Sequence, residues 1–178
     1  MSQLITIKDK QFKPYITQQK IAEAVKRLAD QINIELKDEF PLFLAVLNGS
    51  FMFAADLLKE IEIPCEVSFI KLSSYQGMST TGAITELIGL NENIEGRTVV
   101  IIEDIVDSGL TLERINAVLV PKKVKQIKTA TILMKPEAYT KKYSVDYIGF
   151  KIPNDFVIGY GLDYDGLGRN LKEIHVLA

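Results

Sequence analysis

The stretch of sequence that decides the fold is residues 99–111, which read VVIIEDIVDSGLT. It begins as a run of β-branched residues, which is typical of a buried central strand. Three carboxylates, those of Glu103, Asp104 and Asp107, follow within five residues at the carboxyl end of this run. In open α/β sheets ligands bind at the carboxyl ends of the strands, so we expect the functional site here.

The loop after this strand has the composition of a phosphate-binding loop. Gly109 permits a tight turn that exposes backbone N–H groups, and Ser108 and Thr111 add hydroxyl donors. Residues 110–119 have the pattern of a helix, whose positive N-terminus favours an anion. Between residues 97 and 114 there is no Lys or Arg to neutralise the acids. A hard cation such as Mg²⁺, shared with a phosphorylated ligand, would do so. Taken alone, the same acids also suit solvated turn residues or a helix cap.

The rest of the chain alternates between helical and strand-like apolar patterns, which indicates one α/β domain over residues 1–178. Thr17 is a candidate cap for a first helix, whose apolar stripe is Ile21, Val25, Leu28, Ala29, Ile32 and Leu36. A short helix follows residues 48–50, with Phe51, Ala54, Ala55 and Leu58 as its expected inner face. Strands are expected at residues 42–47, 66–72, 84–90, 98–102, 127–134, 146–150 and 156–160.

Composition excludes several classes of protein. Of the 178 residues, 47% are apolar and 25% charged, as in globular chains rather than disordered or collagen-like ones. The net charge of −2 provides no global basic field for nucleic acid. One histidine and one cysteine, Cys65, exclude a Cys/His zinc site and fit a reducing compartment. Because neither a signal peptide nor a membrane-spanning run is visible, a cytoplasmic location is expected.

Residues 73–82 differ from the rest because they are small and polar and offer little to bury. Gly77 and Gly82 lie within this segment. We expect it to be a flexible lid that closes over the site and excludes water.

The combination of apolar strand, acidic pair, Asp-Ser-Gly-x-Thr loop and helix resembles the phosphoribosyl-pyrophosphate signature of the type I phosphoribosyltransferases. The resemblance extends over nearly the whole chain and is specifically to hypoxanthine (hypoxanthine-guanine) phosphoribosyltransferases. Residues 46–57 resemble the pyrophosphate-binding loop of that family, although Asn48 stands where the family often has Lys or Arg. Residues 73–82 resemble its flexible catalytic loop, and residues 155–164 resemble its purine-clamping segment.

The resemblance implies a fold, a reaction and a role for each matching residue. The fold is a central parallel sheet flanked by helices, with a small hood built from terminal segments. The reaction converts a 6-oxopurine and phosphoribosyl pyrophosphate into nucleoside monophosphate and pyrophosphate, with Mg²⁺ as cofactor, and hypoxanthine and guanine as the expected bases. Assembly as a homodimer or homotetramer is also implied, with no nucleic-acid or membrane partner.

The implied site residues fall into groups by the part of the substrates that they contact. Asp107 is the candidate general base. Glu103 and Asp104 hold the ribose hydroxyls and, with Asp163, Mg²⁺. The remaining groups are Asp107, Ser108, Gly109, Leu110 and Thr111 for the 5′-phosphate; Ile105, Lys135, Phe156, Val157 and Asp163 for the base; Asn48, Gly49 and Arg169 for pyrophosphate; and Ser74 and Tyr75 in the flexible loop.

Two alternatives stay open at this point. The same signature occurs in RNA-binding attenuators of pyrimidine operons, which would need a basic face. The one basic cluster, Lys122, Lys123, Lys125 and Lys128, is interpreted as a solvated surface. The other alternative is a phosphoribosyltransferase for xanthine or for guanine alone.

Overall fold

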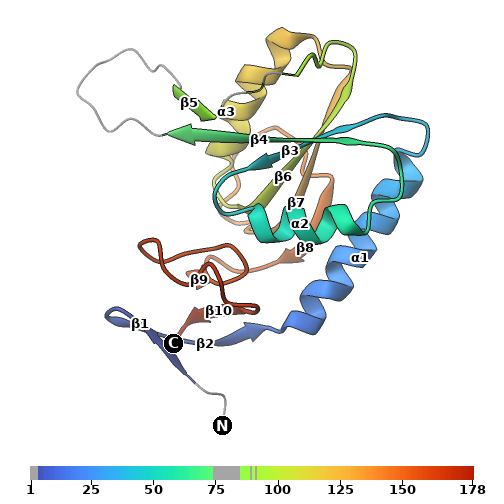
Figure 1. The fold of residues 1–178 in the computed structure, drawn as a ribbon. Helices are drawn as coiled ribbons and strands as arrows, with labels where there is room; N and C mark the ends of the chain where they lie inside the picture. The colour runs from blue at the N-terminus through green and yellow to red at the C-terminus, as the bar shows by residue number, and fades with distance from the viewer. Residues whose placement is uncertain (1–3, 74–84, 89, 91) are drawn as a thin grey trace.

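The central element of the fold is a six-stranded sheet, whose strands are labelled in Figure 1. The computed structural model describes residues 4–73, 85–88, 90 and 92–178. The strand order is β5 (Thr85–Ile88), β4 (Glu66–Ser73), β3 (Leu42–Val46), β6 (Thr98–Val106), β7 (Gln126–Met134) and β8 (Tyr147–Lys151). The pairs from β4 to β8 are all parallel, and only the edge strand β5 runs antiparallel. The predicted parallel sheet is confirmed.

Helices cover both faces of this sheet. α1 (Gln18–Glu35) and α2 (Phe51–Lys59) pack on one face, and α3 (Leu110–Leu119), followed by the short 3₁₀ helix η1 (Val120–Lys122), packs on the other. Successive residues of β3 divide between the two cores, because neighbouring side chains of a strand point to opposite faces. As expected, the Thr17 hydroxyl caps α1 by accepting from the Lys20 N–H at 3.4 Å.

The predicted inner face of α2 is half right: Ala54 is buried and Leu58 packs against the core, but Phe51 and Ala55 do not. The buried side chains are Phe53, Ala54 and Leu57, whereas Phe51 is 43% exposed and Ala55 is exposed. The helix has apolar residues around most of its circumference, so apolar spacing does not fix which stripe faces the core. The rotation of α2 is set instead by the turn before it, where buried Ser50 donates its hydroxyl to the Val46 carbonyl at 2.7 Å.

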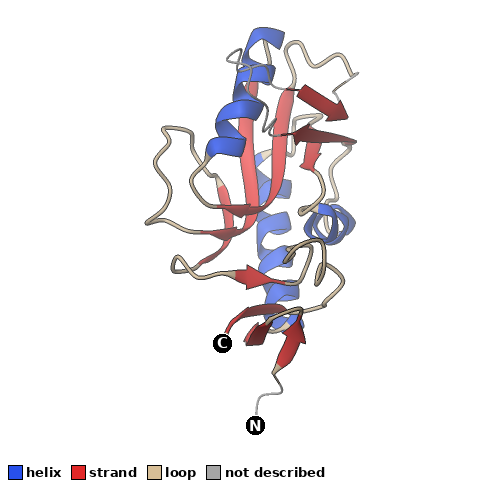
Figure 2. Ribbon diagram, turned by 90° about the vertical axis from the view of Figure 1, so that its left-hand side faces the viewer, coloured by secondary structure: helices blue, strands red, loops and turns tan. Residues whose placement is uncertain are grey.

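A second, smaller sheet forms the hood, and both described chain ends lie in it (Figure 2). Its strand order is β1 (Ile5–Ile7), β2 (Lys10–Ile16), β10 (Ile174–Leu177) and β9 (Val157–Ile158), and all its pairs are antiparallel. The hood of terminal segments is therefore confirmed. The strand predicted at 156–160 is shorter than expected, and β2 was not predicted.

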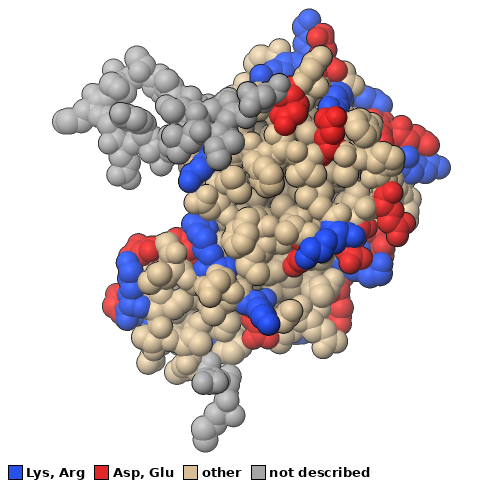
Figure 3. Space-filling model, in the orientation of Figure 1, with Lys and Arg blue, Asp and Glu red and all other residues tan. Residues whose placement is uncertain are grey.

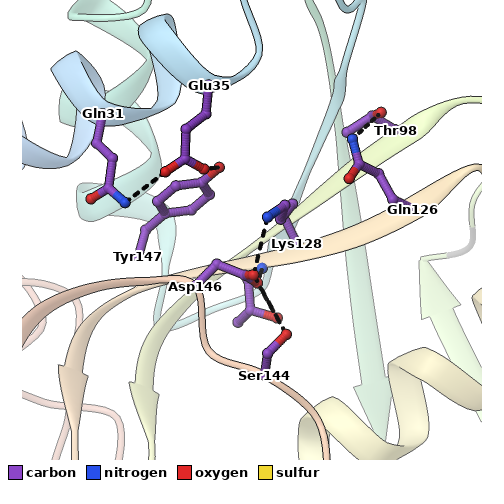
Figure 4. A network of polar contacts seen from close by, with 9 residues as sticks. Gln31, Glu35, Thr98, Gln126, Lys128, Ser144, Asp146 and Tyr147 are labelled. Carbon is purple, nitrogen blue, oxygen red and sulfur yellow. Dashed lines mark hydrogen bonds and ion pairs between the residues drawn. The ribbon is translucent and has the colours of Figure 1, made fainter.

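A network of polar contacts fastens α1 to the β7–β8 edge of the central sheet (Figure 4). The Tyr147 hydroxyl donates to Glu35 at 2.8 Å, and Gln31 donates to the same carboxylate at 2.9 Å. These hydrogen bonds lower the pKa of Glu35. Asp146 accepts from the Thr129 N–H at 2.8 Å and forms an ion pair with Lys128 at 3.4 Å.

The lysine cluster considered as an RNA-binding patch is largely neutralised by acids. Besides the Lys128–Asp146 pair, Lys123 lies 3.5 Å from Glu95, and Lys125 forms an ion pair with Glu39. The face in Figure 3 likewise intersperses both signs of charge. This arrangement disfavours a continuous basic surface of the kind that binds nucleic acid.

Candidate active site

The acidic pair lies within strand β6 itself, because the strand continues to Val106 rather than ending at residue 102 as predicted. β3 pairs with β6 only up to the Ala45–Ile102 position, whereas β7 continues beside β6 to Val106. The side of β6 that faces β3 is thus left without a strand partner next to Glu103 and Asp104. The ladder on the β7 side keeps these two residues extended and fixed in place.

Burial dominates the electrostatics of the pair. Glu103 is only 4% exposed, and its pKa is raised well above the ordinary value, first by desolvation and then by the neighbouring Asp104. Burial also raises the pKa of Asp104 to about 6. The Ile105 N–H, at 2.9 Å from Asp104 Oδ1, and the positive charge of Arg169 oppose this rise. A cation bound beside Glu103 and Asp104 would therefore stabilise their ionised forms.

The predicted phosphate loop connects β6 to α3 and lines a cavity of about 230 Å³. Residues 103–112 line it without interruption, so Ser108, Leu110 and Thr111 all border the same space. Gly109 precedes α3 with φ of +82°, and a Cβ atom there would lie 2.5 Å from the ring of Tyr139. Only glycine fits this position, so the loop brings its N–H groups to the start of a ten-residue helix.

Asp107 and Lys135, predicted as general base and base-recognition residue, form an ion pair at 3.0 Å. Lys135 follows β7 and is 8% exposed, and its N–H donates to the Val106 carbonyl at 2.9 Å. Asp107 follows β6 and is exposed. The buried ammonium group of Lys135 and the accessible carboxylate of Asp107 therefore lie together at the ends of two neighbouring parallel strands. Ile105 packs against the core beneath them.

The β3–α2 loop reaches the acidic pair through Gly49, where a Cβ atom would lie only 1.6 Å from Asp104 Oδ2. The other side of this loop touches the hood, because a Cβ atom at Gly161 would lie 2.0 Å from the Gly49 carbonyl oxygen. Asn48, which precedes Gly49, is exposed. The loop predicted to bind pyrophosphate thus passes between the Asp104 side chain of the central sheet and the backbone of the hood.

The hood contributes a second set of polar groups. Arg169 forms an ion pair with Asp163 at 2.7 Å and donates to the Gly161 carbonyl at 2.7 Å. The other carboxylate oxygen of Asp163 accepts from the Gly166 N–H at 2.6 Å. Arg169 lowers and Asp163 raises the pKa of Asp104, so the hood brings both charges near the acidic pair.

Phe156, predicted to stack on the purine, is 42% exposed, and the neighbouring Val157 is buried in β9. The Phe156 ring lies 6.2 Å from that of Phe12 and 5.9 Å from that of Tyr164, between centroids. Lys10 Nζ lies 5.5 Å from the Phe156 ring centroid. Strand β2, which contains Lys10 and Phe12, therefore packs against Phe156.

Sequence reasoning missed two contributions to the site. Phe12 belongs to β2, a strand whose pattern gave no signal. Arg114 lines a second cavity of about 230 Å³ together with Gly49, Glu103 and Asp104. Its signal was the helical spacing from Thr111, since residues three apart lie on the same face of a helix.

The described residues contain no group of three or more His, Cys, Asp or Glu side chains that could hold a metal ion by themselves. Mg²⁺, however, is usually bound by one or two carboxylates together with substrate phosphates and water. Glu103 and Asp104 fit that requirement, since burial makes their paired negative charge costly. Ser74 and Tyr75 lie outside the described residues.

Comparison with known families identifies the class of protein to which this fold belongs. Residues 14–165 match the family model described as "Phosphoribosyl transferase domain", and the chain belongs to this family.

Within the family, the chain is similar to proteins named hypoxanthine-guanine phosphoribosyltransferase. It is 42% identical to that of Bacillus subtilis (strain 168) over 167 residues, which are 93% of this chain and 92% of that one. Among solved structures, it resembles a hypoxanthine-guanine phosphoribosyltransferase from Bacillus anthracis, with a TM-score of 0.86 and 38% identity over 93% of this chain and 96% of the other. A hypoxanthine phosphoribosyltransferase from Staphylococcus aureus gives a TM-score of 0.87 and 36% identity, covering 93% and 91% of the two chains.

Proposed function

We propose that this protein transfers the 5-phosphoribosyl group of phosphoribosyl pyrophosphate to hypoxanthine and guanine. The products are the nucleoside monophosphates IMP and GMP and pyrophosphate, and the reaction salvages free purine bases. The observation that carries the proposal is the meeting of the acidic pair, the phosphate loop and the Asp107–Lys135 pair at one sheet edge. The similarity to relatives with this activity along 93% of the chain supports it.

The ribose phosphate of the substrate binds along the β6–α3 connection. The 5′-phosphate accepts hydrogen bonds from the N–H groups and hydroxyls of residues 107–111, at the positive end of α3. The ribose hydroxyls then lie beside Glu103 and Asp104. As the bond to pyrophosphate breaks, positive charge grows on the ribose ring, and these buried carboxylates stabilise it.

The purine binds between Lys135 and the hood. Lys135 donates to the 6-oxo group, which selects 6-oxopurines over adenine. Phe156 stacks on the ring, Ile105 packs beside it, and the backbones of Val157 and Asp163 contact the 2-position.

Asp107 accepts the proton from an imidazole nitrogen of the purine, and that nitrogen forms the new bond to the anomeric carbon. The electron pair of the broken carbon–oxygen bond leaves on pyrophosphate. Gly49, Asn48 and Arg169 accept the leaving group, and Arg169 is held ready for it by Asp163. The 3.0 Å ion pair keeps Asp107 and the Lys135 ammonium at neighbouring positions before the base arrives.

Mg²⁺, held by Glu103 and Asp104 together with substrate oxygens, neutralises the phosphates when it is bound. Asp163 is a further predicted ligand, although in this structure both of its carboxylate oxygens already accept hydrogen bonds or an ion pair.

We further propose that the chain is one cytoplasmic domain that assembles as a homodimer or homotetramer. Phe51, Val67 and Phe69 are each more than 40% exposed, and the β3–β4 register places Val67 and Phe69 on the sheet face that α2 covers. The space-filling view shows a broad uncharged area near the middle of the same side (Figure 3). In the residues described, no helix has the length and apolarity needed to cross a membrane.

A panel of four bases tests the proposal. Purified protein is mixed with phosphoribosyl pyrophosphate, Mg²⁺ and hypoxanthine, guanine, xanthine or adenine, and nucleotide formation is followed by absorbance. Hypoxanthine and guanine should react, adenine should not, and chelation of Mg²⁺ should stop the reaction. Turnover of xanthine alone would assign the chain to another base. Salt-dependent RNA binding without turnover would favour the attenuator class instead.

A further inference from the structure

Arg114 lies in the second turn of α3 and lines a cavity of about 230 Å³ between the β3–α2 loop and the end of β6. The cavity adjoins the one formed by residues 103–112, and Glu103, Asp104 and Thr111 line both. Of the described residues that line it, Arg114 is the one with a positive charge. The lining residues are Val46, Leu47, Gly49, Leu72, Glu103, Asp104, Thr111 and Arg114.

The guanidinium of Arg114 is free to bind a ligand. It is partly buried, yet in the described part of the chain it has neither a hydrogen bond nor an ion pair. The other two cations of the site are occupied, Arg169 by Asp163 and Gly161, and Lys135 by Asp107. A guanidinium has five N–H donors, and those of Arg114 are therefore available to a ligand that enters the cavity.

The two carboxylates of the cavity do not fill this role. Among the described residues, neither Glu103 nor Asp104 forms an ion pair with Arg114, and the arginine ion pair at this site is Arg169–Asp163. Arg114 therefore faces the cavity from the α3 side without pairing with the acids. An anionic ligand that enters the cavity would lie between Arg114 and any cation held by the acidic pair. Phosphate oxygens suit this position, because the planar guanidinium fork matches their geometry.

We propose that Arg114 binds the pyrophosphate group of phosphoribosyl pyrophosphate and of the released product. This inference rests on the proposed transferase function. The cavity includes Leu47 and Gly49, which belong to the loop predicted to hold pyrophosphate, whereas residues 107–110 of the phosphate loop line only the neighbouring cavity. Asn48 brings no charge to the pyrophosphate loop, and Arg114 supplies a positive charge from the opposite wall.

The test is direct binding of pyrophosphate and of IMP, each with Mg²⁺, measured by titration calorimetry on the wild-type protein and on Arg114→Gln. A charged hydrogen bond contributes about 1.5–3 kcal/mol, which corresponds to roughly 10–150-fold in dissociation constant. The dissociation constant of pyrophosphate should rise by at least about tenfold in Arg114→Gln. IMP carries only the 5′-phosphate, so its binding should stay within about twofold of wild type.

Two further variants keep the result interpretable. Arg114→Lys preserves the positive charge but loses the planar guanidinium that can donate two parallel hydrogen bonds to a phosphate, and it should bind pyrophosphate with intermediate affinity. Lys122→Gln removes one positive charge from η1, the short helix that follows α3, and should leave both dissociation constants unchanged. Preserved IMP binding reports that Arg114→Gln is folded.

Three outcomes would overturn the inference or its basis. Unchanged pyrophosphate binding in Arg114→Gln would remove Arg114 from the site. Weaker IMP binding with unchanged pyrophosphate binding would place Arg114 on the 5′-phosphate and contradict the inference. Failure of the wild-type protein to bind either ligand would refute the proposed function itself, which is a distinguishable result.

Discussion

Replacement of Asp104 by Asn should make the folded protein more stable while it removes activity. Burial raises the pKa of Asp104 from 3.8 to about 6. Each pKa unit is equivalent to about 1.4 kcal/mol, so a fully ionised Asp104 costs the fold about 3 kcal/mol. Because the side chain keeps some solvent contact, we discount this figure and expect a gain of about 2 kcal/mol in Asp104→Asn at pH 8.

The gain should depend on pH in a defined direction. The folded state binds the proton of Asp104 more tightly than the unfolded chain does, so the contribution of Asp104 to stability falls as pH rises from about 4 to about 6. Well below pH 3.8 Asp104 is protonated in both states, and the advantage of the variant disappears. Well above pH 6 Asp104 is ionised in both states, and the advantage is constant. Urea unfolding at a series of pH values between 4 and 8 measures it.

A matched control is Asp38→Asn, which changes a carboxylate whose side chain is 87% exposed. It should leave the free energy of unfolding nearly unchanged at every pH. Mg²⁺ with phosphoribosyl pyrophosphate should stabilise the wild-type protein more than Asp104→Asn, since the ligand relieves the repulsion that the variant lacks. If Asp104→Asn is less stable than wild type at pH 8, or if its advantage does not vary with pH, the electrostatic reasoning is wrong.

Three other substitutions test individual roles. Asp107→Asn should lower turnover by roughly 10²–10⁴-fold with little change in phosphoribosyl-pyrophosphate affinity, as for a lost general base, and wild-type turnover would exclude this role. Lys135→Ala should weaken the use of hypoxanthine and guanine by about 1.5–3 kcal/mol in kcat/KM, and an unchanged base panel would show that another group contacts the 6-position. Gly49→Ala should displace the Asp104 carboxylate, because the new methyl would lie 1.6 Å from Oδ2, and raise the KM for phosphoribosyl pyrophosphate more than that for the base. Equal changes in the two constants would contradict this last assignment.

The central sheet was predictable from sequence because its strands are buried on both faces. Continuous apolar runs such as Leu42–Val46 and the start of β6 leave few alternatives to a parallel, covered sheet. The loop at Gly109 was predictable as well, because glycine and the hydroxyl residues beside it are the types that a phosphate-binding turn requires. These signals are local, and each is complete within about a dozen residues.

The hood was not predictable in detail because its signals come from partners far away in sequence. β2 contains three polar or charged residues and Pro14, which argue against a strand. Pro14 is tolerated because β1 pairs only with residues 10–12, so one side of the strand is open at that point. The isolated pair Val157–Ile158 is similarly a strand only because β10 lies beside it.

The site was predicted as a set of residues but not as an arrangement. The Asp107–Lys135 pair joins positions 28 residues apart, and its formation depends on the β6–β7 register. The contact between Gly161 and Gly49 depends on how the hood sits on the β3–α2 loop, which no sequence pattern encodes. Arg114 was overlooked because a lone arginine in a helix usually belongs to a solvated surface.

The pairing of β2 with β10 has a consequence for synthesis of the chain. The last strand of the central sheet ends at Lys151, whereas the hood cannot close before residues 174–177 have left the ribosome. Since chains generally begin to fold from the N-terminal side during translation, the growing protein passes through a stage with a finished sheet and an unpaired β2. A stop codon just before Ile174 would hold the protein at that stage. It would leave β2 and β9 without the strand that joins them, so losing the last five residues should inactivate the enzyme as completely as losing a much longer segment.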